Sequence, residues 1–118
     1  MQRRDFGMYP EDQPGVLTKT YQACTLMLVH TPMGHWCGYV KVPHWSMSTS
    51  YDKAPISRID VHGGVTFSEG RDDGSVVVGF DCGHTCDWDD PLLQDKEWLW
   101  SQCWQMAEQL LKAKAHHG

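Results

Sequence analysis

The side chains with the most chemical capacity are histidines, cysteines and aspartates, gathered in three stretches of the chain at residues 34–40, 60–67 and 79–87. Imidazole, thiolate and carboxylate groups bind metal ions, transfer protons or form hydrogen bonds with a polar ligand. Each of these uses requires the three stretches to meet in the fold. The chemistry therefore depends on the elements that carry them.

A metal site is the first use to consider, because His35-x-Cys37 and Cys82-x-His84-x-Cys86 contain the preferred ligands of zinc. Neither stretch has the C-x2-C spacing of a zinc finger. Strand alternation also places Cys82 on an apolar side, where a free cysteine behaves as a small hydrophobic residue. We therefore predict no metal site and no other cofactor, and a protein that folds without metal.

The strongest indication of a ligand site is the sequence Asp60-Val61-His62-Gly63-Gly64. Residues without Cβ let backbone N–H groups approach whatever the histidine contacts, although a diglycine can equally mark a bulge or a turn. We predict that His62, Gly63 and Gly64 form the centre of a ligand site. The other residues predicted to bind the ligand are Arg58, Asp60, Tyr39, His84, Asp81, His35 and Trp45.

The hydrophobic pattern predicts an α+β fold, with an antiparallel sheet of about five strands packed on one long C-terminal helix. Residues 1–20 are expected to form an N-terminal arm, 23–82 the sheet and 43–55 a surface loop. The expected strands are 23–30, 36–42, 56–62, 65–68 and 75–81, and the expected helix is 95–115. The first two strands should form a hairpin, because Pro32 and Gly34 favour a turn between them.

Alternation along the strands divides the sheet into two faces, because residues two apart share a face. The apolar face, expected to pack on the helix, consists of Trp36, Val40, Val42, Ile59, Val61, Val76, Val78 and Phe80. The polar face consists of Cys37, Tyr39, Lys41, Arg58, Asp60, His62, Gly79 and Asp81, with Thr66 beside them. The alternative to a site here is a solvated face whose charges pair across strands.

The helix has the expected start and end signals, with Asp95 as a suitable N-cap and Lys112 and Lys114 in the last turn. Its apolar residues cover an arc of about 160°. They are Leu99, Trp100, Cys103, Trp104, Met106, Ala107, Leu110 and Leu111. An arc this wide leaves apolar surface beyond the sheet, so we predict a homo-oligomer.

Composition excludes several classes of protein. A chain of 118 residues, with 41% hydrophobic and 21% charged residues, is typical of one folded domain. The net charge of -5 argues against binding to duplex nucleic acid, and no stretch has the pattern of an export signal or a membrane span. Five cysteines, an odd number, indicate reduced thiols and a cytoplasmic location.

Three motifs resemble those of a family of small bacteriophage and prophage proteins. Residues 34–40 match G-H-x-C-G-Y-V, 60–67 match D-V-H-G-G-[LV]-T-[YF], and 79–87 match G-F-D-C-x-H-x-x-D, whereas Trp45 and Cys86 depart from the usual pattern. Phage accessory proteins of this size often counter host defences, some as oligomeric sponges for immune signals. The resemblance thus implies an anti-defence protein of the infected cell's cytoplasm that sequesters a nucleotide-derived ligand without cleaving it.

Such a ligand would need flat side chains for its base and N–H groups or a cation for its phosphate. Tyr39, Trp45 or Trp36 could supply the first, and Arg58, Gly63 and Gly64 the second.

Two other functions stay open. A hydrolase would use Asp60, His62, His84 and Asp81 or Asp87 for metal binding or acid–base chemistry, or Cys37 as a nucleophile served by His62 or His84. A direct inhibitor of a host enzyme would bind through a surface rich in the chain's six tryptophans.

Overall fold

The core of the structure is a five-stranded antiparallel sheet in the order β1-β2-β3-β5-β4. This computed structural model describes residues 9–32, 34–81 and 95–117. The strands are β1 (Leu17–Tyr21), β2 (Cys24–His30), β3 (Trp36–Val42), β4 (Phe67–Gly70) and β5 (Val76–Asp81). The expected α+β fold and the hairpin of β2 and β3 are both confirmed.

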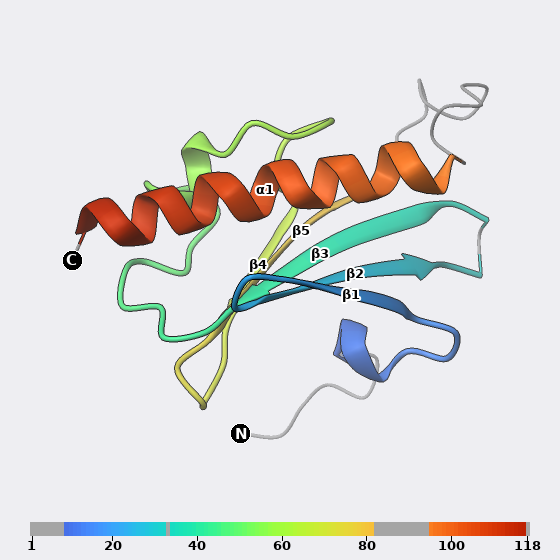
Figure 1. Ribbon diagram of the computed structural model, residues 1–118, viewed down its shortest axis with the longest axis horizontal. Coiled ribbons are helices and arrows are strands. Elements are labelled where there is room, and N and C mark those ends of the chain that lie inside the picture. The colour runs from blue at the N-terminus through green and yellow to red at the C-terminus, as the bar shows by residue number, and fades with distance from the viewer. Residues whose placement is uncertain (1–8, 33, 82–94, 118) are drawn as a thin grey trace.

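The helix α1 (Lys96–His117) lies across one face of the sheet (Figure 1). Asp95 caps it as expected, because its Oδ1 accepts the N–H of Glu97 at 2.9 Å. The residues that α1 buries completely are Leu99, Cys103, Met106, Ala107 and Leu110. Trp104 stays 50% exposed, so the described structure leaves one edge of the apolar arc uncovered. Across the described ranges, no helix combines the length and apolarity of a membrane span.

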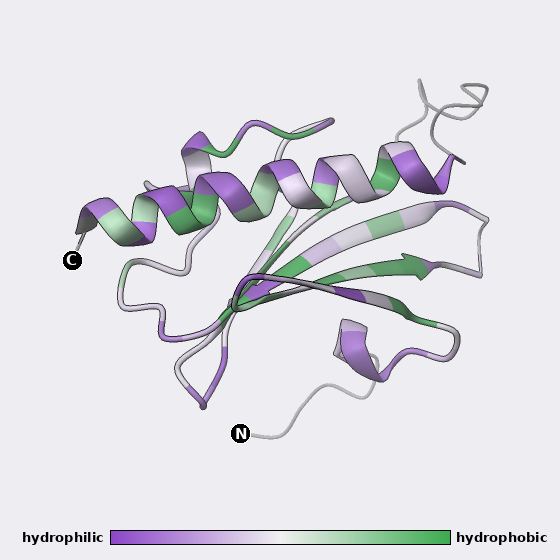
Figure 2. Cartoon of the chain, viewed as in Figure 1, coloured by the Kyte–Doolittle hydropathy of each residue, from purple (hydrophilic) through white to green (hydrophobic). Residues whose placement is uncertain are grey.

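Strand alternation gives the sheet two distinct faces. Val40, Val78 and Phe80 face α1 and pack with it in one hydrophobic cluster. The residues between them, such as Tyr39 and Gly79, therefore face the other side. Figure 2 shows hydrophobic residues along β2 and a mixture of hydrophobic and hydrophilic residues around α1.

The predicted strand 56–62 is wrong. Residues Ile56–Arg58 form a short 3-10 helix, η2, and the chain then runs in irregular conformation to residue 66, with residues 59–62 beside α1. Ile56, Ile59 and Val61 are buried in the core, but the spacing of the first two suits a helical turn rather than a strand. The fifth strand is β1, four of whose five residues lie within the stretch 1–20 that was expected to be an arm.

The N-terminal part of the described chain covers the sheet face opposite α1. A second 3-10 helix, η1 (Pro10–Asp12), lies on that side (Figure 1). Met27 and Val77, which also point away from α1, are fully buried. This segment therefore extends the apolar core beyond the helix-covered face.

Arg71 fastens this segment to the sheet. Its guanidinium donates two hydrogen bonds to the Glu11 carboxylate, at 2.8 and 3.4 Å, and one to Glu69 at 2.7 Å. It also lies 3.4 Å from the centroid of the Tyr9 ring. Burial alone would raise the pKa of Glu11, but Arg71 and the nearby Lys41 outweigh it and hold that pKa below its ordinary value.

Candidate functional site

The structure divides the predicted polar face between the two sides of the sheet. Cys37, Tyr39 and Asp81 lie on the side opposite α1, as expected from alternation in β3 and β5. Residues 58–62 lie beside α1 on the other side. The predicted convergence of all these residues is therefore wrong, because residues 59–62 pair with the helix rather than with a strand.

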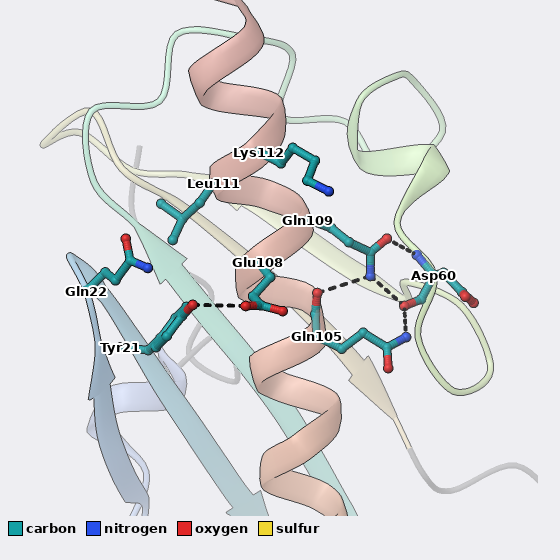
Figure 3. Close-up of a pocket in the computed structure, with 8 residues that line it drawn as sticks. All are labelled: Tyr21, Gln22, Asp60, Gln105, Glu108, Gln109, Leu111 and Lys112. Carbon is teal, nitrogen blue, oxygen red and sulfur yellow. Dashed lines mark hydrogen bonds between the residues drawn. The ribbon is translucent and has the colours of Figure 1, made fainter.

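Three glutamines of α1 hold this segment in place. Gln102, Gln105 and Gln109 are spaced to share one face of the helix, and we name them the glutamine row. Gln109 Oε1 accepts the N–H of Asp60 at 2.7 Å, and the Asp60 carbonyl accepts hydrogen bonds from Gln109 and Gln105 at 2.8 and 2.7 Å (Figure 3). Gln102 accepts the N–H of His62 at 3.0 Å. These contacts satisfy the main chain that a neighbouring strand would otherwise satisfy.

The predicted centre of the site, His62-Gly63-Gly64, forms a turn. Gly63 and Gly64 have φ angles of 70° and 79°, and the Gly64 N–H donates to the Val61 carbonyl at 2.8 Å. Positive φ favours glycine, so the turn accounts for the diglycine. The half-buried His62 ring meets Trp98 edge to face at 5.3 Å and lines neither of the two pockets described below.

Of the other predicted ligand residues, Trp45 does not add to a site. Trp45 is a core residue, 7% exposed, and its indole N–H donates to the Ser48 carbonyl at 3.1 Å. A base could not stack on a ring buried in this way. His84 lies outside the described residues, as do Cys82, Cys86 and Asp87.

His35, Cys37 and Asp81 form a compact group, the His–Cys–Asp cluster, on the face opposite α1. Cys37 and Asp81 are directly paired between β3 and β5, and His35 precedes Cys37 by two residues. His35 Nε2 lies 3.1 Å from an Asp81 carboxylate oxygen. One ligand atom from each of the three residues lies within 4.8 Å of the others. On the far side of the imidazole, His35 Nδ1 lies 3.4 Å from the Thr31 hydroxyl.

The electrostatics of the cluster keep its thiol protonated. Burial, together with the Asp81 carboxylate, raises the pKa of Cys37 to about 12, and a hydrogen bond from Tyr39 offsets only part of this. Burial and the adjacent Cys37 also raise the pKa of Tyr39 above its ordinary range. His62, the predicted base, lies on the α1 side of the sheet, so it cannot activate Cys37 as a nucleophile.

One surface pocket, about 500 Å³, lies over the outer side of α1 (Figure 3). It is lined by Tyr21, Gln22, Asp60, Gln105, Glu108, Gln109, Leu111 and Lys112. Tyr21 donates a hydrogen bond to Glu108 at 3.0 Å. With two carboxylates and one amine, this pocket is poorly suited to an anionic ligand.

The second pocket, about 340 Å³, lies between α1 and the chain around η2, and we name it the cationic pocket. It is lined by Ala54, Pro55, Arg58, Ile59, Gln109, Lys112, Ala113 and His116. Arg58, Lys112 and His116 are its titratable groups, and within the described chain their side chains form no ion pair or hydrogen bond. Basic groups thus surround a partly apolar floor.

Comparisons with protein-family models, with curated proteins and with solved structures found no match. A proposal for function must therefore come from the geometry and the sequence motifs of this chain.

Sequence reasoning identified Arg58 but missed its neighbours on the helix. Gln109, Lys112 and His116 repeat at i, i+3 and i+7, which indicates a shared helix face. Lys112 was explained only by its favourable position in the last turn of the helix, so this pattern was overlooked. The position of residues 54–59 over that face follows only from the tertiary structure.

Proposed function

We propose that this protein binds and sequesters a small nucleotide-derived ligand in the cationic pocket without cleaving it. The observation that carries the proposal is local charge. In a chain of net charge -5, three basic side chains that form no ion pair or hydrogen bond with the described residues surround one partly apolar pocket. Its volume of about 340 Å³ falls within the range of about 300–1,000 Å³ found for small-molecule sites.

The two kinds of lining surface match the two parts of a nucleotide. Arg58 and Lys112 can bind a phosphate through charge-assisted hydrogen bonds, and a guanidinium can do so with two bonds at once. Pro55, Ile59 and Ala113 offer apolar contact to a base. The resemblance to phage proteins supports a host immune signal as the class of ligand.

The lining residues favour retention over cleavage. Hydrolysis requires a nucleophile or a general base, usually assisted by an acid or a metal. The described residues lining this pocket include no carboxylate and no thiol, which leaves His116 as the only imidazole among them. A bound phosphate would therefore meet donors and cations rather than a reactive group.

The test is titration of the whole protein with ADP-ribose and with a cyclic dinucleotide, followed by denaturation and mass analysis of what is released. We expect intact ligand to be recovered. Arg58→Gln should weaken binding by about 10- to 100-fold, because a hydrogen bond to a charged group contributes about 1.5–3 kcal/mol. Lys53→Gln is the matched control, since Lys53 is exposed in the same loop but does not line the pocket.

Three outcomes would contradict the proposal. Recovery of reaction products would indicate a hydrolase. Equal losses of affinity in the two variants would show that the cationic pocket is not the site. Failure of the folded protein to retain either probe would favour the direct inhibitor of a host enzyme.

A further inference from the structure

We infer that the His–Cys–Asp cluster is a binding site for a divalent transition metal ion, with Zn²⁺ as the best match. His35 Nε2, Cys37 Sγ and an Asp81 carboxylate oxygen are the ligand atoms. This site lies on the sheet face opposite the cationic pocket, so the inference does not depend on the proposed function.

The separations in the cluster suit one shared ion. Zinc binds nitrogen, oxygen and sulfur at about 2.0–2.3 Å, so two ligand atoms on a tetrahedral ion lie about 3.3–3.8 Å apart. The three ligand atoms here lie within 4.8 Å of one another, and His35 Nε2 and Asp81 Oδ1 are 3.1 Å apart. Small side-chain rotations, which move the ligand atoms by less than about one bond length, would therefore bring all three onto one ion.

The backbone fixes the positions of these three side chains, because two of them lie on paired strands and the third lies next to a strand. Cys37 and Asp81 face each other across the β3–β5 ladder. The main chain of His35 is fixed next to the strand, because its carbonyl accepts the N–H of Thr31 at 2.8 Å. Ligands on paired strands keep their spacing, which reduces the ordering cost of binding an ion.

Groups around the ligands also fit a metal site. Coordination through Nε2 leaves the proton of His35 on Nδ1, 3.4 Å from the Thr31 hydroxyl that could accept it. Metal-bound histidines usually donate their second N–H in this way. The Tyr39 phenol bonds to the Cys37 sulfur, where it would also support a thiolate.

The donor set selects among ions. Sulfur and imidazole nitrogen favour zinc and neighbouring transition metals over Mg²⁺ or Ca²⁺, which take oxygen ligands. Three protein ligands leave a fourth position for water or an anionic group, the pattern of open zinc sites rather than closed structural ones. Such a site is compatible with a chain that folds before it binds metal.

The experiment uses the full chain after chelator treatment, titrated with Zn²⁺ in a calorimeter and with Co²⁺ in a spectrophotometer. We expect one strong zinc site and a sulfur-to-cobalt charge-transfer band. His35→Gln and Asp81→Asn should each weaken zinc binding at least tenfold, and Cys37→Ser should abolish the band. Thr31→Val should weaken binding less. His30→Gln is the control, since His30 is exposed on the neighbouring strand but not in the cluster.

Stoichiometry alone does not identify the site, because the chain has five cysteines and seven histidines. Unchanged zinc affinity in both His35→Gln and Asp81→Asn would overturn the inference, as would absence of zinc binding by the wild type. If Cys37→Ser fails to fold, His35→Gln decides the question, because that side chain is 22% exposed and its replacement leaves the core intact. Melting temperatures without metal verify that each variant is folded.

Discussion

The bond network around Arg71 allows a quantitative test of how the N-terminal segment is held. We consider Arg71→Met, Glu11→Gln and the double variant. Methionine keeps apolar contact with the Tyr9 ring but removes the charge, and glutamine keeps the shape of Glu11 while removing its charge. The coupling energy of the double-mutant cycle then isolates the Arg71–Glu11 pair.

The expected magnitude follows from burial. Exposed ion pairs contribute about 0.2–1 kcal/mol, whereas hydrogen bonds to charged groups in sheltered positions contribute about 1.5–3 kcal/mol. The Arg71 side chain is only 6% exposed and Glu11 is 27% exposed, and the contact is bidentate. We discount for the partly exposed carboxylate and expect a coupling of about 1.5–2 kcal/mol. Arg71→Met alone should cost about 3 kcal/mol, because Glu69 also loses its partner.

The assay is urea unfolding of the four proteins at neutral pH, with Lys41→Met as a control. The Lys41 amine comes no closer than 3.8 Å to Glu11 and 3.6 Å to Asp73, and its side chain is 32% exposed. Lys41→Met should therefore lower the free energy of unfolding by less than about 1 kcal/mol. A coupling below about 0.5 kcal/mol would refute the reasoning, because it would place the Arg71–Glu11 pair among ordinary surface contacts.

The contribution of Glu11 to stability should also depend on pH in a defined direction. The pKa of Glu11 is lowered in the folded state, so its contribution is present above the unfolded pKa and lost as pH falls through the folded one. The stability difference between wild type and Glu11→Gln should therefore shrink below about pH 4. A difference that stayed constant would show that the carboxylate charge is not what holds the segment.

Three further predictions concern other parts of the molecule. Gly38→Ala should lower the free energy of unfolding in urea by about 3 kcal/mol, because a Cβ there would overlap the Phe80 ring. The control Gly74→Ala, in open space at φ 87°, should lower it by only about 1–2 kcal/mol. Equal losses in the two variants would argue against the packing at Gly38. With metal removed, Cys37 should be alkylated at about pH 8 at least 100-fold more slowly than a free thiol, because its pKa is raised to about 12 and the thiolate is the reactive form. Peptide mapping measures the labelling, and rapid labelling of Cys37 would disprove its burial. Light scattering should give the mass of a dimer or larger oligomer, and Trp104→Glu should reduce it; a wild-type monomer at all concentrations would exclude the predicted oligomer.

The elements that sequence predicted well are those whose pattern is decided locally. The run of apolar residues in β2 and the Pro and Gly after it define the hairpin with β3, and Asp95 defines the start of α1. β1 escaped prediction because its five residues show little burial and lie at the sheet edge, where alternation is weak. Its pairing partner, rather than its composition, makes it a strand.

The two candidate sites were less predictable, because the contacts that assemble them are long-range. Alternation correctly placed Cys37 and Asp81 on one face, but nothing local reveals that they are paired across two strands. The error at residues 58–62 has a different cause, since Ile59 and Val61 alternate as a strand would. The glutamine row of α1 satisfies their backbone, so the segment joins the helix layer and carries Asp60 and His62 away from the sheet face.

The two candidate sites are therefore separated by the sheet itself. The cationic pocket is built from α1 and residues 54–59, on the helix side, whereas the His–Cys–Asp cluster projects from the opposite face of β3 and β5. The side chains of Val40, Val78 and Phe80 fill the layer between the sheet and α1. Within one chain, a metal ion in the cluster could not contact a ligand in the pocket, so metal binding would not by itself make the sequestered ligand a substrate. For this reason His35→Gln should leave nucleotide affinity unchanged and Arg58→Gln should leave zinc affinity unchanged, which lets either proposal fail without the other.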